Sequence, residues 1–424
     1  MNILEEFFPL RRHQIAPGSD RLVRLMRSPE GSAALMLRCV LVVGTNGKGS
    51  TSRMLEAELT RQDITVGTYS SPHFVDPLER IRIAARKADP ELVKGAKETV
   101  QDWVKLNLPD ATFFEITTAI ALLCFYRAQV DLGVIEAGIG ARFDSTNALA
   151  PLVTILTSVG LDHMNYLGPD EEVIAFDKSF GSRRNCPYVC GFLSAAALRG
   201  VRRALAITGA KYVASDPSWS GIGAPAAPDS DPLPPKLRNA LTACSALDAL
   251  QECLNFSRPF DQQEVVQRLS LLPLPGRFEV HPVSNLTAFE GFQGDIILDN
   301  GHNPSAIQAL LREYEHSRFA GKKFNLVFGS LKEKDYARSL ALLCAHAETV
   351  TLVQFEHQDS LTFQDMSQFT AVNRIVVQDI RHVLLQNFAC NDLPHLVTGS
   401  FAFVGEVMKE LQICPDISDS IVVR

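Results

Sequence analysis

Short runs of β-branched and other apolar residues alternate with longer stretches of helical periodicity along most of the chain. This alternation predicts an α/β fold in which a parallel sheet is flanked by helices. The expected strands are Val40–Val43, Val134–Glu136, Val153–Ser158, Asp295–Leu298, Asn325–Phe328, Thr349–Val353, Arg374–Val377 and His395–Val397. Because ligands in open α/β sheets bind at the carboxyl ends of the strands, residues that directly follow these runs are the first candidates for a functional site.

A different pattern interrupts this alternation between Ser215 and Pro235. The stretch holds six prolines and two glycines, a composition that sustains neither a helix nor a central strand. The 424 residues of the chain are enough for roughly two or three domains. The stretch is therefore either a domain boundary or a long surface loop inside one domain.

Composition and charge narrow the class of protein. Hydrophobic residues make up 46% of the chain and charged residues 21%, a balance that excludes a disordered, collagen-like or low-complexity protein. The formal net charge of −7 argues against a general nucleic-acid partner, which needs a basic field. No nucleic-acid partner is therefore expected.

Cysteine usage and the lack of long apolar runs indicate the compartment. The nine cysteines are scattered and odd in number, a pattern typical of reduced cytosolic thiols. Cys186 and Cys190 form a C-x3-C pair, but no second Cys or His pair has zinc-site spacing, so no metal is assigned to cysteine. The N-terminus lacks the apolar region of a signal peptide, and no apolar run of about 18 residues could span a bilayer. We expect a cytoplasmic protein with no membrane partner.

The strongest local signal is a glycine-rich turn, Gly44–Thr51, which follows a strand and leads into a helical pattern. Backbone N–H groups of such a turn cradle phosphates, and Lys48 would reach the outer phosphates. The turn differs from a Walker A sequence because Gly49 follows the lysine where that motif has Ser or Thr. A magnesium ligand must therefore come from Ser50, Thr51 or a residue farther along the chain.

Polar residues at the ends of later strands are candidates for that ligand. Ser71 follows a short run that ends at Gly67, Glu136 ends the strand that begins at Val134, and His163 lies just after Val153–Ser158. One hydroxyl, one carboxylate and one imidazole at successive strand ends would suit a Mg²⁺ ion beside a bound triphosphate.

Together these motifs resemble the folylpolyglutamate synthase and dihydrofolate synthase branch of the Mur ligase superfamily, and the resemblance covers almost the whole chain. The matching segments are Gly44–Ser50, Ser71–His73 with Glu79–Ile81, Phe114–Ala119, Glu136–Asn147, Asp162–Gly168, Leu274–Glu279, Leu298–Pro304 and Thr398–Ser400. The chain departs from the family pattern at Ile139, Ala141 and Ser145, after Lys178, where Ser179-Phe180-Gly181 replaces A-G-I, and at Asn300-Gly301, which replaces Gly-Ala.

The resemblance implies two domains and places the boundary just after the P-G-R-x-E motif. Residues 1–282 would form the ATP-binding central domain, a P-loop ATPase-like unit with a parallel sheet. Residues 283–424 would form a smaller Rossmann-like α/β ligase domain. On this interpretation the proline-rich stretch is a loop, and ATP and substrates lie in the cleft between the domains.

The resemblance also implies roles for single residues. Catalytic roles fall to Lys48, His163, Lys178 and His302, and Lys178 is expected to be carbamylated. The expected nucleotide-binding residues are Thr45, Asn46, Gly47, Lys48, Gly49, Ser50, Asn239, Arg277 and Asp299. Two Mg²⁺ ions are expected, with Ser71, Glu136 and His163 as ligands and Glu136 bridging. The pterin part of the substrate is expected at Thr112, Phe113, Phe114, Glu115, Phe143, Asp144 and Ser145, although Phe113 and Phe114 also suit a place in the core.

The implied reaction is ATP-dependent ligation of L-glutamate to dihydropteroate, which forms dihydrofolate through an acyl phosphate. The resemblance also implies glutamate addition to tetrahydrofolate. The enzyme is expected to be a monomer. One alternative is a synthase that only lengthens folate tails. Another is a Mur-type ligase acting on a UDP-linked precursor, but only 43 residues precede Gly44, too few for the nucleotide-sugar domain of those enzymes. A third is a P-loop switch or binding protein, which would need neither Glu136, His163 and Lys178 nor the motif at Asp299.

Overall fold

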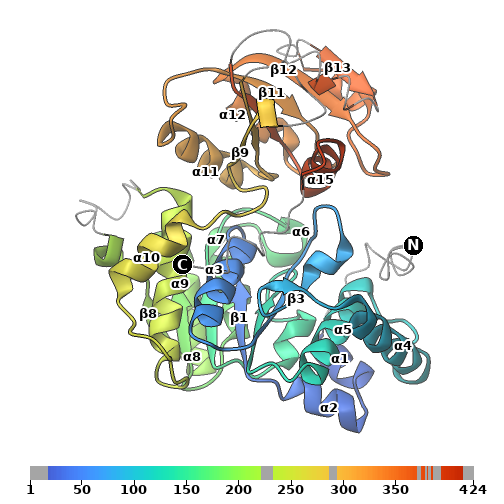
Figure 1. The fold of residues 1–424 in the computed structure, drawn as a ribbon, viewed down its shortest axis with the longest axis vertical. Helices are drawn as coiled ribbons and strands as arrows, with labels where there is room; N and C mark the ends of the chain where they lie inside the picture. The colour runs from blue at the N-terminus through green and yellow to red at the C-terminus, as the bar shows by residue number, and fades with distance from the viewer. Residues whose placement is uncertain are drawn as a thin grey trace. The chain divides into compact units, whose positions relative to one another are not determined.

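The computed structural model describes residues 18–220, 233–285, 294–369, 374–377, 380, 383–384 and 393–413 (Figure 1). Their contacts form two units: the first holds the residues as far as Ser71 together with Asp76–Leu272, and the second holds Pro72–Val75 and the chain from Pro273 onward. The division at Leu272 lies ahead of the expected boundary at 282. The reason is that β9 (Glu279–Pro282), which contains the end of the P-G-R-x-E motif, pairs with β10 (Asp295–Leu298).

The described ends of the proline-rich stretch, residues 215–220 and 233–235, belong to the first unit. Its residues 221–232 lie outside the described residues. On either side of them, a short 3-10 turn covers Pro217–Ser220 and a helix begins at Pro235, where a proline is tolerated in the first helical turn.

An eight-stranded sheet forms the centre of the first unit, in the order β4-β3-β2-β5-β1-β6-β7-β8. The strands from β2 to β8 in this order run parallel, and β3 and β4 add an antiparallel hairpin at one edge. Their bounds are β1 (Cys39–Val43), β2 (Val66–Tyr69), β3 (Ile81–Ile83), β4 (Arg86–Lys87), β5 (Leu132–Glu136), β6 (Val153–Leu156), β7 (Pro187–Cys190) and β8 (Lys211–Ala214).

Helices cover this sheet so that its central strands are buried on both faces. Every residue of β1 is buried, and Cys39, Leu41 and Val43 share one core cluster with residues of α4, α5 and α8. In turn, α3 packs on β2 and β5, and α9 packs on β6 and β7. The helices of this unit are α1 (Asp20–Leu25), α2 (Pro29–Leu35), α3 (Lys48–Arg61), α4 (Pro90–Asn107), α5 (Phe113–Arg127), α6 (Met164–Leu167), α7 (Glu171–Lys178), α8 (Ala195–Thr208), α9 (Pro235–Leu250) and α10 (Gln262–Leu271).

The second unit has a six-stranded sheet in the order β13-β12-β11-β14-β10-β9, parallel except for the edge strand β9. Ile296 and Leu298 pack with residues of α15, whereas the intervening Ile297 packs with α11 and α12. Alternate side chains of the strand therefore point to opposite faces of the sheet, and helices cover both faces, so the unit has three layers. The further elements are β11 (Phe324–Phe328), β12 (Ala347–Gln354), β13 (Arg374–Val377), β14 (His395–Thr398), α11 (Pro304–Glu315), α12 (Tyr336–Cys344), α13 (Phe363–Met366) and α15 (Phe401–Glu410).

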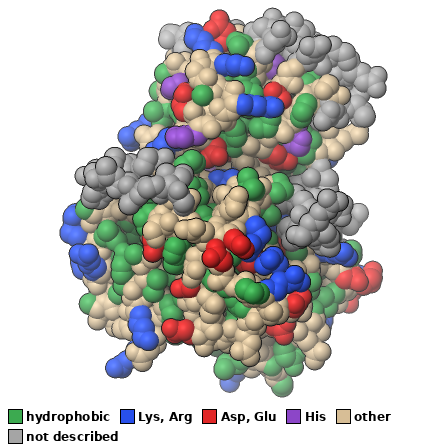
Figure 2. Space-filling model, turned by 60° about the vertical axis from the view of Figure 1, so that its left-hand side comes forward, with side chains coloured by type: hydrophobic (Ala, Val, Ile, Leu, Met, Phe, Trp, Pro, Cys, Tyr) green, Lys and Arg blue, Asp and Glu red, His purple; other side chains and the backbone are tan. Residues whose placement is uncertain are grey.

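Surface features add little to the sequence-based picture. Acidic and basic side chains are interspersed over the face of the first unit shown in Figure 2. Among the described residues, no helix is both long and apolar enough to cross a bilayer. The seven cysteines in that part of the chain are free thiols, while Cys390 and Cys414 lie outside it.

Candidate active site

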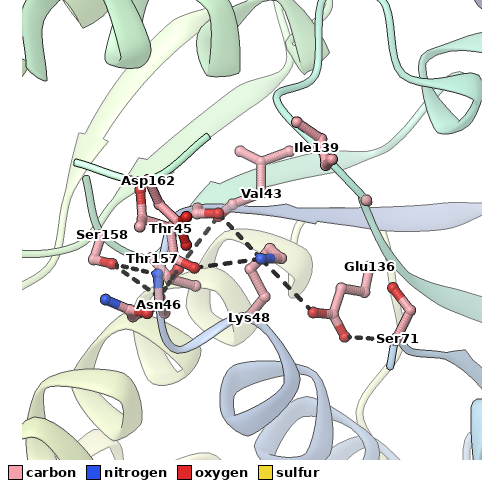
Figure 3. Close-up of polar contacts among 12 residues, drawn as sticks. Val43, Thr45, Asn46, Lys48, Ser71, Glu136, Ile139, Thr157, Ser158 and Asp162 are labelled. Carbon is pink, nitrogen blue, oxygen red and sulfur yellow. Dashed lines mark hydrogen bonds and ion pairs between the residues drawn. The ribbon is translucent and has the colours of Figure 1, made fainter. Parts of the chain in front are cut away.

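The glycine-rich segment forms the turn between β1 and α3 (Figure 3). Gly47 precedes the helix in the left-handed region, at φ +85°, which glycine adopts without strain. The first helical hydrogen bond follows directly, from the N–H of Thr51 to the carbonyl of Gly47 at 2.9 Å. Because the N–H groups of a first helical turn have no partners inside the helix, this turn is suited to bind phosphate.

Residues just after β6 hold this loop in place. The Ser158 hydroxyl accepts the N–H of Asn46 at 3.0 Å and donates to its carbonyl at 2.9 Å. The Thr157 hydroxyl donates to the same carbonyl at 2.6 Å, and the N–H of Thr45 donates to the carbonyl of Ser158 at 2.9 Å (Figure 3). The predicted nucleotide-binding residues Thr45 and Asn46 are thus positioned by a neighbouring strand end.

Lys48 places its positive charge next to Glu136, at the end of a neighbouring strand. Its Nζ atom donates to the carbonyls of Gly44 at 3.2 Å and Thr45 at 3.4 Å, and lies 3.9 Å from Oε1 of Glu136. Glu136 ends β5, and its Oε2 atom accepts the backbone N–H of Ser71 at 3.2 Å (Figure 3). The structure therefore brings Lys48, Glu136 and Ser71 together at the ends of three adjacent strands.

Lys178 joins this group from the end of α7. Its side chain is buried, and Nζ donates to the carbonyl of Gly44 at 3.1 Å, the same oxygen that accepts from Lys48. Burial, followed by the positive charge of Lys48, lowers the pKa of Lys178 to about 7. The neutral amine is therefore well populated near neutral pH.

His163 directly precedes α6 as its N-cap residue and lies in the left-handed region, at φ +51°, which is uncommon for a residue with a side chain. Its N–H donates to Oδ1 of Asp162 at 2.9 Å, and its Nε2 atom lies 3.9 Å from the same oxygen. In the described parts of the chain, no three His, Cys, Asp or Glu side chains form a group that could hold a metal ion. The expected magnesium ligands are one carboxylate, Glu136, one imidazole, His163, and the Ser71 hydroxyl, so they would not form such a group. This ligand set stays a prediction.

Asn239, on α9, lies against the phosphate loop. A Cβ atom added to Gly47 would lie 2.5 Å from Oδ1 of Asn239, so the amide occupies the space that the glycine leaves open. The structure thus places Asn239 beside the expected nucleotide site, and its contact with the nucleotide stays a prediction.

The second unit contains the remaining residues predicted to face the nucleotide. Asp299 follows β10, and its carboxylate accepts the N–H of Phe278 at 2.9 Å and that of Gly301 at 2.8 Å. Burial raises the pKa of Asp299, while the nearby charge of Arg277 opposes this shift. The carboxylate therefore joins the P-G-R-F-E turn to the strand end that carries L-D-N-G-H-N-P.

Arg277 and His302 are neighbours at this strand end. Arg277 donates to Oδ1 of the buried Asn300, and its guanidinium lies 5.3 Å from the ring centre of Phe401. The Nδ1 atom of His302 is 3.0 Å from the carbonyl of Asn300, and its ring centre is 6.0 Å from that of Phe401. Asn300 stands where the family pattern has glycine, and here its side chain positions Arg277.

The segment from Thr112 to Glu115 starts α5 as a capping box. The Glu115 carboxylate accepts the N–H of Thr112 at 2.7 Å, and the Thr112 hydroxyl accepts the N–H of Glu115 at 3.3 Å. Glu115 also pairs with Arg21 at 2.7 Å. Phe113 belongs to the core cluster, and Phe114 packs against it. Both rings therefore contribute to the core, which was the alternative to a place in the substrate site. Substrate contacts of this segment stay a prediction.

Asp144 holds the segment after β5 in shape. Its buried carboxylate accepts the N–H groups of Gly138 at 3.1 Å and Ile139 at 3.2 Å. It also accepts the N–H of Thr146 at 2.9 Å and its hydroxyl at 2.6 Å. Burial raises the pKa of Asp144 despite these bonds. Four donors on one carboxylate give it a structural role, and a contact with substrate stays a prediction.

Phe143 and Ser145, on either side of Asp144, have different surroundings. The Phe143 ring is 54% exposed, and the guanidinium of Arg142 lies 5.1 Å from its centre and 4.7 Å from that of Phe180. The Ser145 hydroxyl is buried with no hydrogen-bond partner among the described residues. An exposed aromatic ring and an available hydroxyl are compatible with a flat heteroaromatic ligand, and the pterin contact of both residues stays a prediction.

No protein-family model matches the chain. A Haemophilus influenzae protein named dihydrofolate synthase/folylpolyglutamate synthase is 31% identical over 395 residues, which cover 87% of each chain. The chain belongs to the dihydrofolate synthase/folylpolyglutamate synthase family. It is also 30% identical over 364 residues to a probable bifunctional folylpolyglutamate synthase/dihydropteroate synthase of Haloferax volcanii, but that match covers 81% of this chain and 42% of the longer relative.

Solved structures confirm the fold class of this dihydrofolate synthase/folylpolyglutamate synthase family member. The structure of Escherichia coli FolC in complex with DHPP and ADP matches with a TM-score of 0.80 at 25% identity, covering 96% of both chains. A bifunctional folylpolyglutamate synthase/dihydrofolate synthase with Mn, AMPPNP and L-glutamate bound matches with a TM-score of 0.78 at 26% identity, covering 97% of this chain and 98% of that one.

Sequence reasoning missed several residues that shape the site of this family member. Asp177 accepts the N–H of Ala141 at 3.0 Å, and Arg21 binds the Glu115 carboxylate, whereas Thr157 and Ser158 hold the phosphate loop. Each of these contacts joins segments far apart in the chain and has no local sequence signature. The position of Asp177, directly before Lys178, was the one available hint.

The contact between Gly47 and Asn239 predicts that the smallest added side chain will impair nucleotide binding. Gly47→Ala would place a methyl carbon 2.5 Å from Oδ1 of Asn239 at a left-handed backbone position. We expect ADP affinity, measured by calorimetry, to fall about 10-fold, because left-handed backbone costs a residue with a side chain on the order of 1–2 kcal/mol. Gly49→Ala is the matched variant, since its Cβ would meet only Glu136, at 3.6 Å. Equal losses in both variants would contradict the steric explanation.

The four donors on Asp144 predict that Asp144→Asn destabilises the first unit. An amide group cannot accept from N–H groups on both of its ends, so buried donors lose partners. We expect the free energy of unfolding, measured with urea, to fall by about 1.5–3 kcal/mol. Asp102, which pairs with Lys105 on the surface at 3.0 Å, is the control, and Asp102→Asn should change stability by less than about 0.5 kcal/mol. Similar effects of the two substitutions would refute the structural role of Asp144.

Proposed function

We propose that this protein uses ATP to ligate L-glutamate to dihydropteroate, forming dihydrofolate, and also adds L-glutamate to tetrahydrofolate. The observation that carries the proposal is the convergence of Lys48, Glu136 and Ser71 at three adjacent strand ends. Membership of the family supports it, as do the ligands named for the similar structures, which are DHPP and ADP in one and Mn, AMPPNP and L-glutamate in the other.

The proposed reaction has two steps. The substrate carboxylate first attacks the γ-phosphorus of ATP, which gives an acyl phosphate and releases ADP. The amine of L-glutamate then attacks the acyl carbon, forms the amide, loses a proton and displaces inorganic phosphate. Both partners of the first step are anions, so a positive charge at the phosphate loop offsets their repulsion and aligns the transfer. Lys48 supplies that charge from within the loop.

The nucleotide phosphates would bind along the loop at Thr45, Asn46, Gly47, Gly49 and Ser50. Arg277, Asp299 and His302 of the second unit are also proposed to serve the nucleotide. A guanidinium suits phosphate oxygens because it is planar and carries several donors. The contact of Arg277 with Asn300 supports this role because it fixes the direction of the guanidinium.

The residues beside the loop fit a magnesium ion. Mg²⁺ prefers oxygen ligands, and Glu136 and the Ser71 hydroxyl provide a carboxylate and a hydroxyl on neighbouring strand ends. His163 is proposed for a second ion. When bound, the ions neutralise phosphate charge and orient the phosphate oxygens.

We also propose that Lys178 is carbamylated. Its burial and its pKa of about 7 support this, because the neutral amine is the form whose nitrogen attacks carbon dioxide, forming an N–C bond and releasing a proton. The product is an anion, so it would replace the repulsion between Lys48 and Lys178 by an attraction. A carboxylate at this position can also bind or orient metal ligands.

The exposed ring of Phe143 and the buried, unpartnered hydroxyl of Ser145 support a pterin site, which both proposed activities need. The test is phosphate release by the purified protein with Mg²⁺-ATP and L-glutamate, comparing dihydropteroate, tetrahydrofolate and no pterin. Turnover with both pterins is expected. Turnover with tetrahydrofolate alone would make the protein a tail-lengthening synthase, and no turnover with either would overturn the proposal.

We further propose that the enzyme acts as a cytoplasmic monomer without nucleic-acid or membrane partners. The free thiols of the described cysteines and the net charge of −7 support this setting. Sedimentation of the purified protein checks the oligomeric state.

A further inference from the structure

The segment Pro72–Val75 belongs by its contacts to the second unit, although the chain on both sides of it belongs to the first. Within this segment, Phe74 packs against the core of the second unit. Its ring stacks on that of Phe401, the first residue of α15, with centres 4.8 Å apart and planes 29° from parallel. The segment is therefore held by a specific aromatic contact.

Two glycines make room for Phe74. A Cβ atom added to Gly276 would lie 2.5 Å from the edge of the Phe74 ring, and one added to Gly405 would overlap the Phe74 carbonyl oxygen. With Phe401, these glycines form a seat for Phe74. Because side chains at either position would displace the segment, the seat is fitted to both the ring and the backbone of Phe74.

The seat is shared with residues of the proposed nucleotide site. Phe401, on which Phe74 stacks, also has the Arg277 guanidinium 5.3 Å and the His302 ring centre 6.0 Å from its own ring centre. One aromatic ring thus contacts Phe74, Arg277 and His302. A change in the position of Phe74 is therefore expected to shift Arg277 and His302 as well.

Both ends of the segment are held in the first unit. Ser71 donates its backbone N–H to Glu136 at 3.2 Å. After the segment, Asp76 caps the turn Pro77–Arg80 and pairs with Lys87 at 3.2 Å. Three residues span at most about 10 Å even when fully extended, so Ser71 cannot move far while Phe74 stays seated.

We infer that Phe74 is a positioning residue for the metal-binding end of the proposed active site. It does not touch the reacting groups. Seated on Phe401, it restrains the loop that presents Ser71 to Glu136, so loss of the aromatic contact is expected to loosen this pair. The inference rests on the proposed function, because it assigns Ser71 and Glu136 to the metal.

The test uses the full chain and compares Phe74→Ala and Phe74→Leu with the wild type. Hydrogen exchange of the peptide around Ser71 reports the loop, and electron paramagnetic resonance with Mn²⁺ and ADP reports the metal. We expect faster exchange in Phe74→Ala and a Kd for Mn²⁺ about 10-fold higher, as when a group that orients a metal ligand is removed. Phe74→Leu keeps an apolar group in the seat and should recover part of the Mn²⁺ affinity.

Two further variants separate positioning from general damage. Gly405→Ala keeps the Phe74 side chain but fills the seat from α15 and so displaces the segment, and it should reproduce the loss of Mn²⁺ affinity. Phe363→Ala, at a 56% exposed phenylalanine of the second unit, should change neither the exchange near Ser71 nor the Kd for Mn²⁺. Binding of ADP without metal should fall less than Mn²⁺ binding in the Phe74 and Gly405 variants, and should stay unchanged in Phe363→Ala.

The outcomes are distinguishable. If the wild type binds no Mn²⁺ in the presence of ADP, the proposed function fails and the inference fails with it. If the wild type binds Mn²⁺ and both Phe74→Ala and Phe74→Leu bind it as tightly as the wild type does, the inference alone is overturned. Equal losses of metal-free and metal-dependent ADP binding in Phe74→Ala would also overturn it, since they would indicate a merely structural role.

Discussion

Lys48→Ala is expected to lower kcat for ligation on the order of 10³-fold, because it removes a preorganised positive charge from the phosphate-transfer site. The Lys48 ammonium lies between the carbonyls of Gly44 and Thr45 and faces Glu136 at 3.9 Å. No other side chain is proposed to supply that charge from within the loop. The measurement is phosphate release with saturating Mg²⁺-ATP, L-glutamate and dihydropteroate.

Lys105→Ala is the matched control for Lys48→Ala, because Lys105 is 73% exposed and pairs only with a surface aspartate in its own helix. It should retain wild-type kcat. Lys48→Arg should recover little activity, since a wide guanidinium does not fit between the two loop carbonyls. A kcat for Lys48→Ala near that of Lys105→Ala would show that the loop does not transfer phosphate in the proposed way.

Lys178→Ala is expected to lose most of the ligation activity, on the order of 10²-fold in kcat, because it removes the group that would become a carbamate. Short carboxylic acids such as acetate should restore part of the activity by standing in for that carboxylate. Lys211→Ala, at an exposed lysine of β8, is the matched control. It should keep wild-type kcat, and added acetate should not alter that kcat. Full activity in Lys178→Ala would remove Lys178 from the mechanism.

The lowered pKa of Lys178 also predicts a pH dependence of stability. In buffer without carbon dioxide, the folded lysine loses its proton above about pH 7, while the unfolded lysine keeps it up to its ordinary pKa of 10.5. The unfolded state then binds more protons, so this group makes stability rise with pH between 7 and 10.5, by up to about 1.4 kcal/mol per pH unit. Lys178→Met removes this slope and should be more stable than the wild type below pH 7. Parallel urea-unfolding profiles of the two proteins would contradict the lowered pKa.

The fold was predictable where strands are central and apolar. All eight expected strands are present, with ends that differ by at most two residues. The missed strands lie mainly toward sheet edges, where β8 is largely exposed and β9 contains Glu279 and ends at a proline. Edge strands need no continuous apolar run, so the apolar pattern does not reveal them.

The candidate site was predictable where one motif follows a strand directly. Glu136 and Ser71 were expected together because parallel strands end at one edge of a sheet, and they are hydrogen-bonded. A carboxylate in a motif, however, does not reveal which way it faces. Asp144 turns to the backbone of its own segment and Glu115 to its own helix end, so neither could be assigned from residue type.

During synthesis, Phe74 leaves the ribosome long before its partners. Phe401 and Gly405 are translated near the end of the chain, so at 5–20 residues per second the ring waits for roughly tens of seconds. During this time an apolar side chain and its loop lack their packing partners, as in the transiently exposed surfaces that chaperones protect. A fragment that ends near residue 272 would contain the complete eight-stranded sheet and still carry this loop unseated. Such a truncation is expected to favour aggregation over a well-behaved nucleotide-binding fragment.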